Sequence, residues 1–555
     1  MDSRKKAFIP IAVIFFAVLA ILTFTAVKLY DHFYGLHRIK AEDYLPEMAE
    51  DEYVVVYDCA YAGKAIEVDG EVYVNLDVVN DEWARELFFY AEDINAVLYT
   101  TQVEQTEFPV EGPEVEVKDG EAYILARTCS EMFGMRFTVN EDDRICMVRK
   151  PSGQMANVDK FRTYLLQNPD PEERFYTAEV GRNDTLEIYG EEVNGYYFAV
   201  CENGYMGYVD ASRITLSPAT LTVKEPDIWE TDEDVLYSHV ISLGFHQVYT
   251  SEFNEDVYYP IYDTSYYLSV LAPTWFSLGE NGSLKSLVNG EYVEWAWWHG
   301  YDVWAVFTNS FDDELTYETL SDTYKRRALV NQLVSAMKMN DIDGLNVDFE
   351  GLSEKTYPYF IQFLRELSIG VRSEDIVLSI DTVVPSEWTD YYRRDIYNDL
   401  CDYVIVMAYD EYWGGSEVAG PVSSKSFTVN AVIDTMACGV AKEKIILGMP
   451  WYTRIWYGED YDDLETEAVE MRTAWLTVYD NDMEVTFDES TGLNYAEGEV
   501  DGRRCRIWLE DEDSVRWRLK LALDSELAGV AAWSIGLENG YIWPAYEDLL
   551  MKANY

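Results

Sequence analysis

The feature that most constrains the fold is a series of eight short apolar runs in residues 230–555, separated by segments long enough for helices. The runs cover residues 240–248, 267–272, 302–308, 344–350, 376–382, 403–409, 445–451 and 529–534. Strands that alternate with helices form parallel sheets. The number of runs and the length of the segment predict a (β/α)8 barrel of the α/β class. The alternative is a doubly wound sheet, which usually carries a glycine-rich phosphate loop that this segment lacks.

The spacing between the last two runs stretches, which predicts an insertion at about 457–525 that ends in a helix at about 513–525. Two shorter stretches precede the barrel segment. Residues 65–76 and 114–125 each consist of an alternating strand, an Asp-Gly turn and a second strand, which is the pattern of a β-hairpin. A small domain is therefore predicted at 51–150. It resembles the N-terminal domain of copper amine oxidases, without a copper-ligand pattern, and we expect a stalk or, alternatively, a wall-binding module.

A second small β-rich domain is predicted at 160–225. Its strand candidates are 185–189, 196–201 and 206–209, with a Glu-Asn-Gly turn between the last two. This pattern, which ends in Gly-Tyr-Val and a helical turn, resembles bacterial SH3-like domains, although many small barrels share it. The resemblance implies binding to cell-wall peptides, and a plain spacer is the alternative.

The N-terminus carries an uncharged run at residues 8–27 behind three basic residues at 4–6. About twenty helical residues match a hydrocarbon core of about 30 Å. Basic residues before such a run favour a cytoplasmic N-terminus. The sequence thus predicts a transmembrane signal anchor at 1–30, a polar linker at 31–50, contact with a lipid bilayer, and a location in the cell membrane with the rest of the chain outside. A cleaved secretion signal is the alternative.

The chain is strongly acidic, with 102 Asp and Glu against 42 Lys and Arg, a net charge of −60. Nucleic-acid binding needs a basic footprint, so no nucleic-acid partner is expected. A neutral or weakly charged polymer is a more natural partner. The 7 cysteines and 5 histidines do not cluster, so neither a metal nor another cofactor is expected. Cys129 and Cys146 fall in one predicted domain and are a candidate disulfide.

The stretch most informative about chemistry is residues 341–351, Asp-Ile-Asp-Gly-Leu-Asn-Val-Asp-Phe-Glu-Gly. Alternate side chains of a strand face the same way, so Asn346, Asp348 and Glu350 line one face and three apolar residues line the other. The apolar face suits packing against helices, and the polar face then points into the barrel. Two buried carboxyl groups one strand step apart repel, so at least one pKa is expected to be raised, as a general acid requires. The alternative is an acidic strand edge in an acidic protein.

Residues 343–350 resemble the DxxDxDxE signature of glycoside hydrolase family 18, the chitinase-like enzymes, with Asn346 in place of one Asp. The Asn form resembles the branch of spore-cortex and cell-wall lytic enzymes. Further resemblances to the family are Met-Ala-Tyr-Asp at 407–410, Gly-Val-Ala-Ala-Trp-Ser at 529–534, Leu-Ala-Pro-Thr-Trp at 271–275 and Gly-Met-Pro-Trp at 448–451. The resemblance covers residues 230–555.

This resemblance implies a role for each matched residue. Glu350 protonates the glycosidic oxygen and then acts as base toward water, while the substrate's own 2-acetamido group attacks the anomeric carbon. Asp348 orients the acetamido N–H and stabilises the oxazolinium charge, and Tyr409 donates its hydroxyl to the acetamido oxygen. Asp410 binds sugar hydroxyls or steadies the strand end, and Trp533 forms the floor under the sugar.

Four other matched residues are assigned to the surroundings of the site. Trp275 and Trp451 follow strands and are expected to line the sugar groove. Asp343 and Gly344 are expected to hold the geometry of the strand and its loop.

Asn346 is expected among the substrate-binding residues, with its amide donated to an ionised Asp348; a weakened enzyme that mainly binds is the alternative. The sequence thus predicts a glycosidase that hydrolyses β-1,4 linkages of N-acetylglucosamine-containing polymers with retention. Peptidoglycan is the preferred substrate, and chitin or host N-glycans come next. The alternative from another class is a non-catalytic glycan-binding or structural surface protein on the same barrel.

Overall fold

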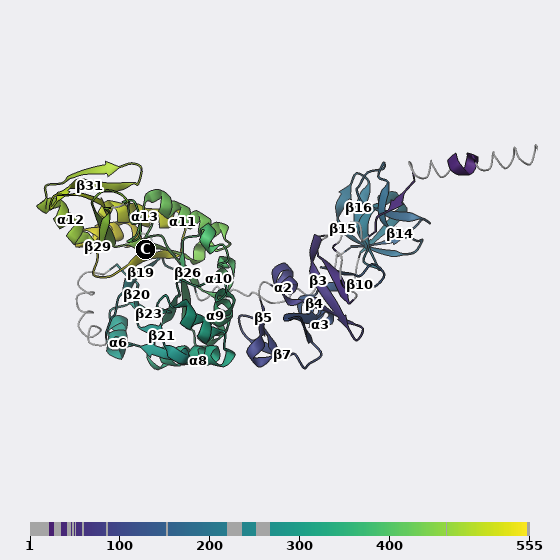
Figure 1. Ribbon diagram of the computed structural model, residues 1–555, viewed down its shortest axis with the longest axis horizontal. Helices are drawn as coiled ribbons and strands as arrows, with labels where there is room; N and C mark the ends of the chain where they lie inside the picture. Colours follow the sequence, from purple (N-terminus) through teal and green to yellow (C-terminus); the bar gives the residue numbers. More distant parts are fainter. Residues whose placement is uncertain are drawn as a thin grey trace, which may run out of the picture. The chain divides into compact units, whose positions relative to one another are not determined.

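The structure is a computed structural model that describes residues 22–26, 35–40, 46, 49, 51–57, 60–84, 87–150, 154–218, 236–250, 267–461 and 463–551. The chain divides into two compact units. The first comprises residues 1–90, 95–97 and 107–227, and the second comprises residues 91–94, 98–106 and 228–555. Figure 1 shows the helices and strands of both units, and each unit is described by itself below.

Eight parallel strands form a closed barrel in the second unit. They are β19 (Ile241–His246), β20 (Val270–Pro273), β23 (Asp302–Thr308), β24 (Gly344–Asp348), β25 (Val377–Val383), β26 (Tyr403–Met407), β27 (Ile445–Pro450) and β33 (Gly529–Trp533). Their order is β20-β19-β33-β27-β26-β25-β24-β23, and the pairing of β20 with β23 closes the ring. Each strand coincides with one of the apolar runs, so the predicted (β/α)8 barrel is confirmed.

Helices lie around the outside of the strands (Figure 1). They are α6 (Gly290–Trp298), α7 (Asp313–Leu320), α8 (Thr323–Met339), α9 (Tyr357–Arg372), α10 (Arg394–Leu400), α11 (Lys425–Ala437), α13 (Glu512–Asp524) and α14 (Trp543–Tyr546). The outward residues of the strands pack against them. Phe349, for example, stacks on Phe360 and Phe363 of α9 at ring-centroid distances of 5.4 and 5.9 Å. The predicted division of β24 into an outward apolar face and an inward polar face is therefore confirmed.

Apolar side chains fill the inside of the barrel at the level where β24 begins. Trp304 of β23 stacks on Tyr403 of β26 with ring centroids 5.5 Å apart, and both belong to one buried cluster with residues of β19, β20, β25, β27 and β33. Gly344 lies against this layer: a Cβ atom there would be 2.4 Å from Trp304 Cδ1. Any larger residue would clash with the indole of Trp304, so only glycine fits at this position at the start of β24. The polar residues further along β24 lie above this apolar layer.

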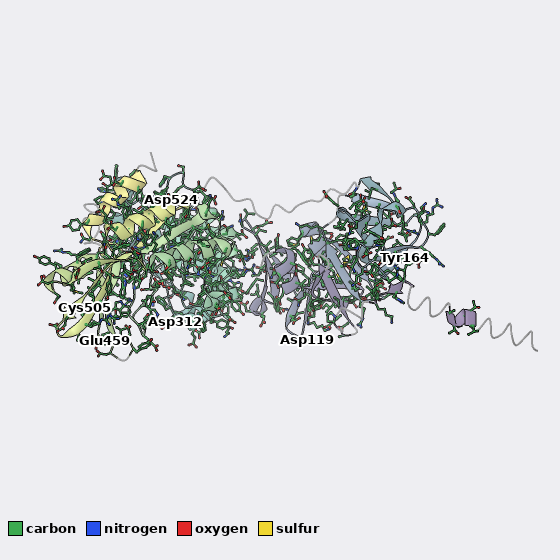
Figure 2. The ribbon with its side chains drawn as sticks, turned by 90° about the horizontal axis from the view of Figure 1, so that it is seen from above. Asp119, Tyr164, Asp312, Glu459, Cys505 and Asp524 are labelled. Atoms are coloured by element: carbon green, nitrogen blue, oxygen red, sulfur yellow. The ribbon has the colours of Figure 1, made fainter. Side chains whose placement is uncertain are left out.

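A separate antiparallel sheet is inserted between β27 and α13. It consists of β28 (Tyr452–Tyr457), β29 (Glu465–Glu470), β30 (Glu484–Asp488), β31 (Leu493–Val500) and β32 (Arg503–Leu509), with α12 (Met471–Asp480) packed on it. Cys505, labelled in Figure 2, lies in β32 and is buried in the core of this sheet. The predicted insertion is confirmed, and it begins a few residues earlier than expected because β28 follows β27 directly.

The first unit contains two sheets of seven and eight strands. The seven-stranded sheet comprises β2 (Glu52–Tyr57), β3 (Ala60–Val68), β4 (Glu71–Asn75), β8 (Val115–Lys118), β9 (Glu121–Leu125), β10 (Arg136–Asn140) and β11 (Ile145–Arg149), with α3 (Ala126–Phe133) beside it. Both predicted Asp-Gly hairpins are present, as β3–β4 and β8–β9. Cys129 and Cys146 are buried free thiols, so the candidate disulfide is not formed.

The eight-stranded sheet of the first unit comprises β1 (His37–Arg38), β12 (Gln154–Val158), β13 (Thr163–Leu166), β14 (Phe175–Val180), β15 (Thr185–Val193), β16 (Tyr196–Cys201), β17 (Met206–Asp210) and β18 (Ile214–Pro218). The three strands expected from the sequence between residues 185 and 209 are confirmed as β15, β16 and β17. Strand β1 lies in the predicted linker and pairs with β14. The resemblances of the two small domains to named families stay predictions.

Part of the predicted domain at 51–150 belongs to the barrel unit. Residues 91–94 and 98–106 group with it, and Asp93 Oδ2 accepts a hydrogen bond of 2.8 Å from the backbone N–H of Thr323 at the start of α8. Gln102 Nε2 donates to the backbone oxygen of Asp399 in α10 at 2.6 Å. These contacts join the segment to the outer ring of helices.

The predicted membrane anchor needs correction. In the part of the chain that the structure describes, none of the helices has the length and apolar character needed to cross a bilayer. This finding contradicts the predicted location in the cell membrane, and it gives no support to the predicted contact with lipid. Residues 22–26 of the predicted span are helical, and residues 8–21 and 27 lie outside the described residues.

Candidate active site

A layer of polar side chains lies inside the barrel above the apolar layer. Asn346 of β24 is fully buried there, and its Nδ2 donates to Ser379 Oγ at 3.1 Å and to Asp381 Oδ1 at 3.0 Å. Both acceptors belong to β25, the neighbouring strand. The expectation that Asn346 donates its amide to Asp348 is therefore wrong, because the two N–H bonds are used within this layer. A side chain so enclosed supports the site from below, with no face open to a sugar.

Two carboxyl groups continue the inward face of β24 toward the C-terminal end of the barrel. Burial raises the pKa of Asp348 to about 6. Burial, together with the charges of Asp348 and Asp410, raises the pKa of Glu350 to about 8. At neutral pH the pair therefore consists of an ionised Asp348 and a protonated Glu350. This combination is what a carboxylate that stabilises positive charge and a general acid require.

The backbone at Glu350 is fixed by Asn309, a buried residue in the loop after β23. Asn309 Nδ2 donates to the backbone oxygen of Glu350 at 2.9 Å, and its Oδ1 accepts from the backbone N–H of Glu350 at 3.1 Å. Asn309 Nδ2 also lies 3.2 Å from Thr316 Oγ1 in α7. The loop is itself anchored by Asp312, labelled in Figure 2, whose Oδ1 accepts from the N–H of Leu315 at 2.9 Å. The backbone of Glu350 is thus fixed by the buried amide of Asn309, and the loop that carries Asn309 is fixed by the capped start of α7.

Tyr409 and Asp410 follow β26. Burial, followed by the charges of Asp381 and Asp348, raises the pKa of the Tyr409 phenol well above its usual value, so the hydroxyl keeps its proton as a donor. Asp410 is exposed, has a φ of 56°, and accepts a hydrogen bond of 2.6 Å from the hydroxyl of Tyr452 in β28. The inserted sheet therefore supplies a residue that orients Asp410.

The three aromatic residues expected in the sugar groove differ in position. Trp533, at the end of β33, is partly exposed and lies 5.4 Å from Phe245 between ring centroids. Trp275 and Trp451 are 1% and 0% exposed and belong to the hydrophobic core, where Trp451 packs on Trp543 at 5.5 Å. The expectation that Trp275 and Trp451 line the groove is therefore wrong, because helix packing covers both indoles.

Asp343 and Gly344 lie at the opposite end of β24 from Glu350. Asp343 Oδ2 accepts from the backbone N–H of Val303 at 2.8 Å and so fastens β24 to β23. Gly344 packs closely against Trp304. Asp343 therefore serves strand pairing and Gly344 serves packing, which is the structural role that the sequence suggested.

The sequence did not predict two residues of the site, Asn309 and Asp381. Asn309 precedes a helix in a loop, and no local pattern distinguishes it. Asp381 did carry a signal: in Val377–Val383, Ser379 and Asp381 alternate with Leu378 and Ile380. That is the same inward-polar, outward-apolar alternation as in β24.

Comparison with known proteins identifies a family match over most of the barrel segment. Residues 308–538, from the end of β23 to just beyond β33, match the family model described as glycosyl hydrolases family 18. The barrel is a family 18 glycoside hydrolase domain. Two curated relatives come from Bacillus subtilis (strain 168). The uncharacterized glycosylase YvbX is 22% identical over 295 residues, which are 50% of this chain and 84% of that protein. The cortical fragment-lytic enzyme is 23% identical over 300 residues, 52% of this chain and 69% of that protein.

Among solved structures, the Bacillus cereus spore cortex-lytic enzyme SleL superposes with a TM-score of 0.52 at 19% identity, over 56% of this chain and 74% of SleL. At this identity the likeness supports the fold alone. With the family match, the prediction of an enzyme is confirmed: the family 18 domain makes this protein a glycoside hydrolase.

Proposed function

We propose that the family 18 domain hydrolyses β-1,4 linkages of N-acetylglucosamine-containing polymers by substrate-assisted, retaining catalysis. Peptidoglycan is the preferred substrate and chitin-like polymers come next. The observation that carries the proposal is the pair of carboxyl groups, Asp348 and Glu350, one strand step apart on the inward face of β24, where burial raises the pKa of both. A protonated carboxyl and a buried carboxylate at the end of a barrel strand suit acid catalysis beside a developing positive charge.

The steps follow from these protonation states. Glu350 donates its proton to the glycosidic oxygen as the bond to the anomeric carbon breaks. The carbonyl oxygen of the substrate's 2-acetamido group attacks the anomeric carbon from the other face and forms an oxazolinium ion. Asp348 accepts from the acetamido N–H and stabilises the positive charge, and Tyr409 donates to the acetamido oxygen. Glu350, now ionised, takes a proton from the incoming water, and the product keeps the original anomeric configuration.

Three further residues complete the proposed site. Trp533 stacks on the apolar face of the sugar, since it is partly exposed at the end of β33. Asp410 binds sugar hydroxyls and is oriented by Tyr452. Asn346 contributes indirectly through β25, since its amide is used inside the barrel.

The preference for peptidoglycan is supported by the Asn-type motif and by relatives whose names refer to cortical fragments and the spore cortex. The acetamido group that attacks must belong to the sugar whose anomeric bond breaks. Cleavage is therefore expected on the reducing side of N-acetylglucosamine.

The deciding experiment compares Glu350→Gln with Glu374→Gln on purified peptidoglycan and, in parallel, on a chitin oligomer. Glu374 is a matched control because it lies just after α9, at the opposite end of the helix from the site, and pairs with Lys338 at 2.6 Å. Removing the acid should lower release of reducing ends by about a hundredfold or more, because a general acid contributes about 10²–10⁴ in rate. The control should stay at the wild-type rate.

Each result bears on a different part of the proposal. Unchanged turnover in Glu350→Gln would refute the assignment of the acid. Release from chitin oligomers with none from peptidoglycan would reverse the substrate preference. An inverted anomer in the first product would refute the substrate-assisted route.

A further inference from the structure

A third carboxyl group lies inside the barrel next to the catalytic pair. Asp381 of β25 is 6% exposed, and its Oδ1 accepts the 3.0 Å hydrogen bond from Asn346. The mechanism proposed above does not use this residue. A buried carboxyl group is costly to maintain unless it has partners or a task.

The pairing of the two strands places Asp381 beside Asp348. Asn346 pairs with Ser379 and Val347 with Ile380, so the next residues along the two parallel strands are Asp348 and Asp381. Neighbouring strands are about 4.8 Å apart, which brings two inward side chains at the same level close together. Asp348 Oδ1 is buried, and among the described residues no hydrogen bond to this oxygen is formed.

We propose that Asp381 is a positioning residue of the active site, which holds a proton on the oxygen that Asn346 does not occupy and presents it toward Asp348. This inference rests on the proposed function of Asp348 and deepens it. The amide of Asn346 selects the oxygen: because Oδ1 accepts from Nδ2, the proton belongs on Oδ2. Asp381 then acts as a neutral donor, and Asp348 is the member of the pair that carries the charge.

The charges around Asp381 favour a neutral Asp381 beside an ionised Asp348. Asp348 and Glu350 face it from β24 and its C-terminal end, and Tyr409 faces it from the end of β26. The charges that act on Asp381 are those of Asp348 and Glu350, and both are negative when ionised. Burial, followed by the charge of Asp348, raises the pKa of Asp381 well above its usual value, and the hydrogen bond from Asn346 opposes this only in part. Two adjacent carboxyl groups without a cation cannot both ionise at neutral pH.

The first test compares Asp381→Asn with Asp381→Val, using a chitin oligomer and peptidoglycan at pH values from 4 to 9. Asn keeps an acceptor for Asn346 and presents N–H groups toward Asp348, so it should keep turnover within about tenfold of wild type and leave the acidic limb of kcat/KM in place. Val has a similar size and no donor. A hydrogen bond to a carboxylate favours its ionised form, so the loss of this bond should move the acidic limb upward by about one to two pH units and lower kcat more than tenfold at pH 6.

Two results would overturn the inference. Equal loss of turnover in Asp381→Asn and Asp381→Val would mean that the site needs an ionised Asp381. An acidic limb that stays in place in Asp381→Val, with only a lower melting temperature, would mean that Asp381 merely fills space.

A second measurement does not depend on turnover. We expect native Asp381 to hold a proton that the unfolded chain releases above about pH 4. The folding equilibrium constant of the wild type, divided by that of Asp381→Asn, should then fall by about tenfold per pH unit between pH 5 and 7. Urea unfolding of the full chain at each pH, followed through the barrel transition, measures this difference, and a constant ratio would overturn the inference. Glu350→Gln keeps the two proposals apart: an active Glu350→Gln refutes the proposed function, whereas an inactive one with a flat Asp381 ratio refutes only the role of Asp381.

Discussion

Asn309→Ala tests whether one buried amide holds the catalytic acid in place. The substitution removes the two hydrogen bonds, of 2.9 and 3.1 Å, that Asn309 makes with the backbone of Glu350. Each bond contributes about 0.5–1.5 kcal/mol net, and leaving buried partners unsatisfied adds to the loss. We expect the free energy of unfolding to fall by about 2–4 kcal/mol. Because a displacement of about 1 Å in a catalytic group can cost about a hundredfold in rate, we expect kcat to fall by a similar factor.

The assay is kcat and KM on a chitin oligomer, with urea unfolding of the same samples. Asn340→Ala is the matched control, since Asn340 ends α8 and donates to the backbone oxygen of Ala336 at 2.8 Å, away from the polar layer. It should lose stability while keeping kcat within about twofold of wild type. If Asn309→Ala loses stability but keeps kcat, the argument that its amide positions Glu350 is refuted.

Three further predictions concern the carboxyl pair, the tryptophans and Gly344 of the barrel. The pH dependence of kcat/KM should be bell-shaped, falling below about pH 6 as Asp348 gains a proton and above about pH 8 as Glu350 loses its proton; a rate that is flat from pH 5 to 9 would contradict these assignments. Trp533→Ala should raise KM for a chitin oligomer with little change in melting temperature, whereas Trp451→Ala should lower the free energy of unfolding by about 3–5 kcal/mol, because Trp451 is fully buried. Gly344→Ala should cost about 1–3 kcal/mol in urea unfolding, since its Cβ would meet Trp304; wild-type stability would show that the indole can move aside.

The barrel could be predicted from the sequence because its strands are continuous apolar runs. Buried parallel strands need apolar residues on both faces, and this pattern is visible without knowledge of long-range contacts. The face of β24 was predictable for the same reason, since a period of two separates Asn346, Asp348 and Glu350 from their apolar neighbours. The alternation alone indicated which carboxyl groups point inward.

The pattern of apolar residues in the sequence does not predict contacts between elements that are far apart along the chain. Asn309 binds the backbone of a residue 41 positions away, and its partner is set only when β23 and β24 pair. Trp275 and Trp451 each follow a strand, as a groove-lining residue would. Both are buried because α6 and α14 supply Tyr292 and Trp543 against their rings. An aromatic residue at a strand end is therefore ambiguous until the packing of the helices is known.

The cluster of carboxyl groups should lower the stability of the barrel as the pH rises. The pKa of Glu350 is raised to about 8 in the folded protein, whereas an unfolded chain releases this proton near 4.5. Between these values the native state holds a proton that the unfolded state has lost, so the free energy of unfolding falls by at most about 1.4 kcal/mol per pH unit, and by less here because Glu350 is only partly buried.

Glu350→Gln removes this linkage, so it should be more stable than wild type at pH 8, with a smaller difference at pH 5, although it turns over no substrate. Such an opposition between stability and activity is expected where a site keeps an acid protonated by burial. Urea unfolding at the two pH values measures the difference. A variant that is less stable than wild type at pH 8 would show that the carboxyl group of Glu350 is stabilised by its surroundings, and the basis for its role as an acid at neutral pH would be lost.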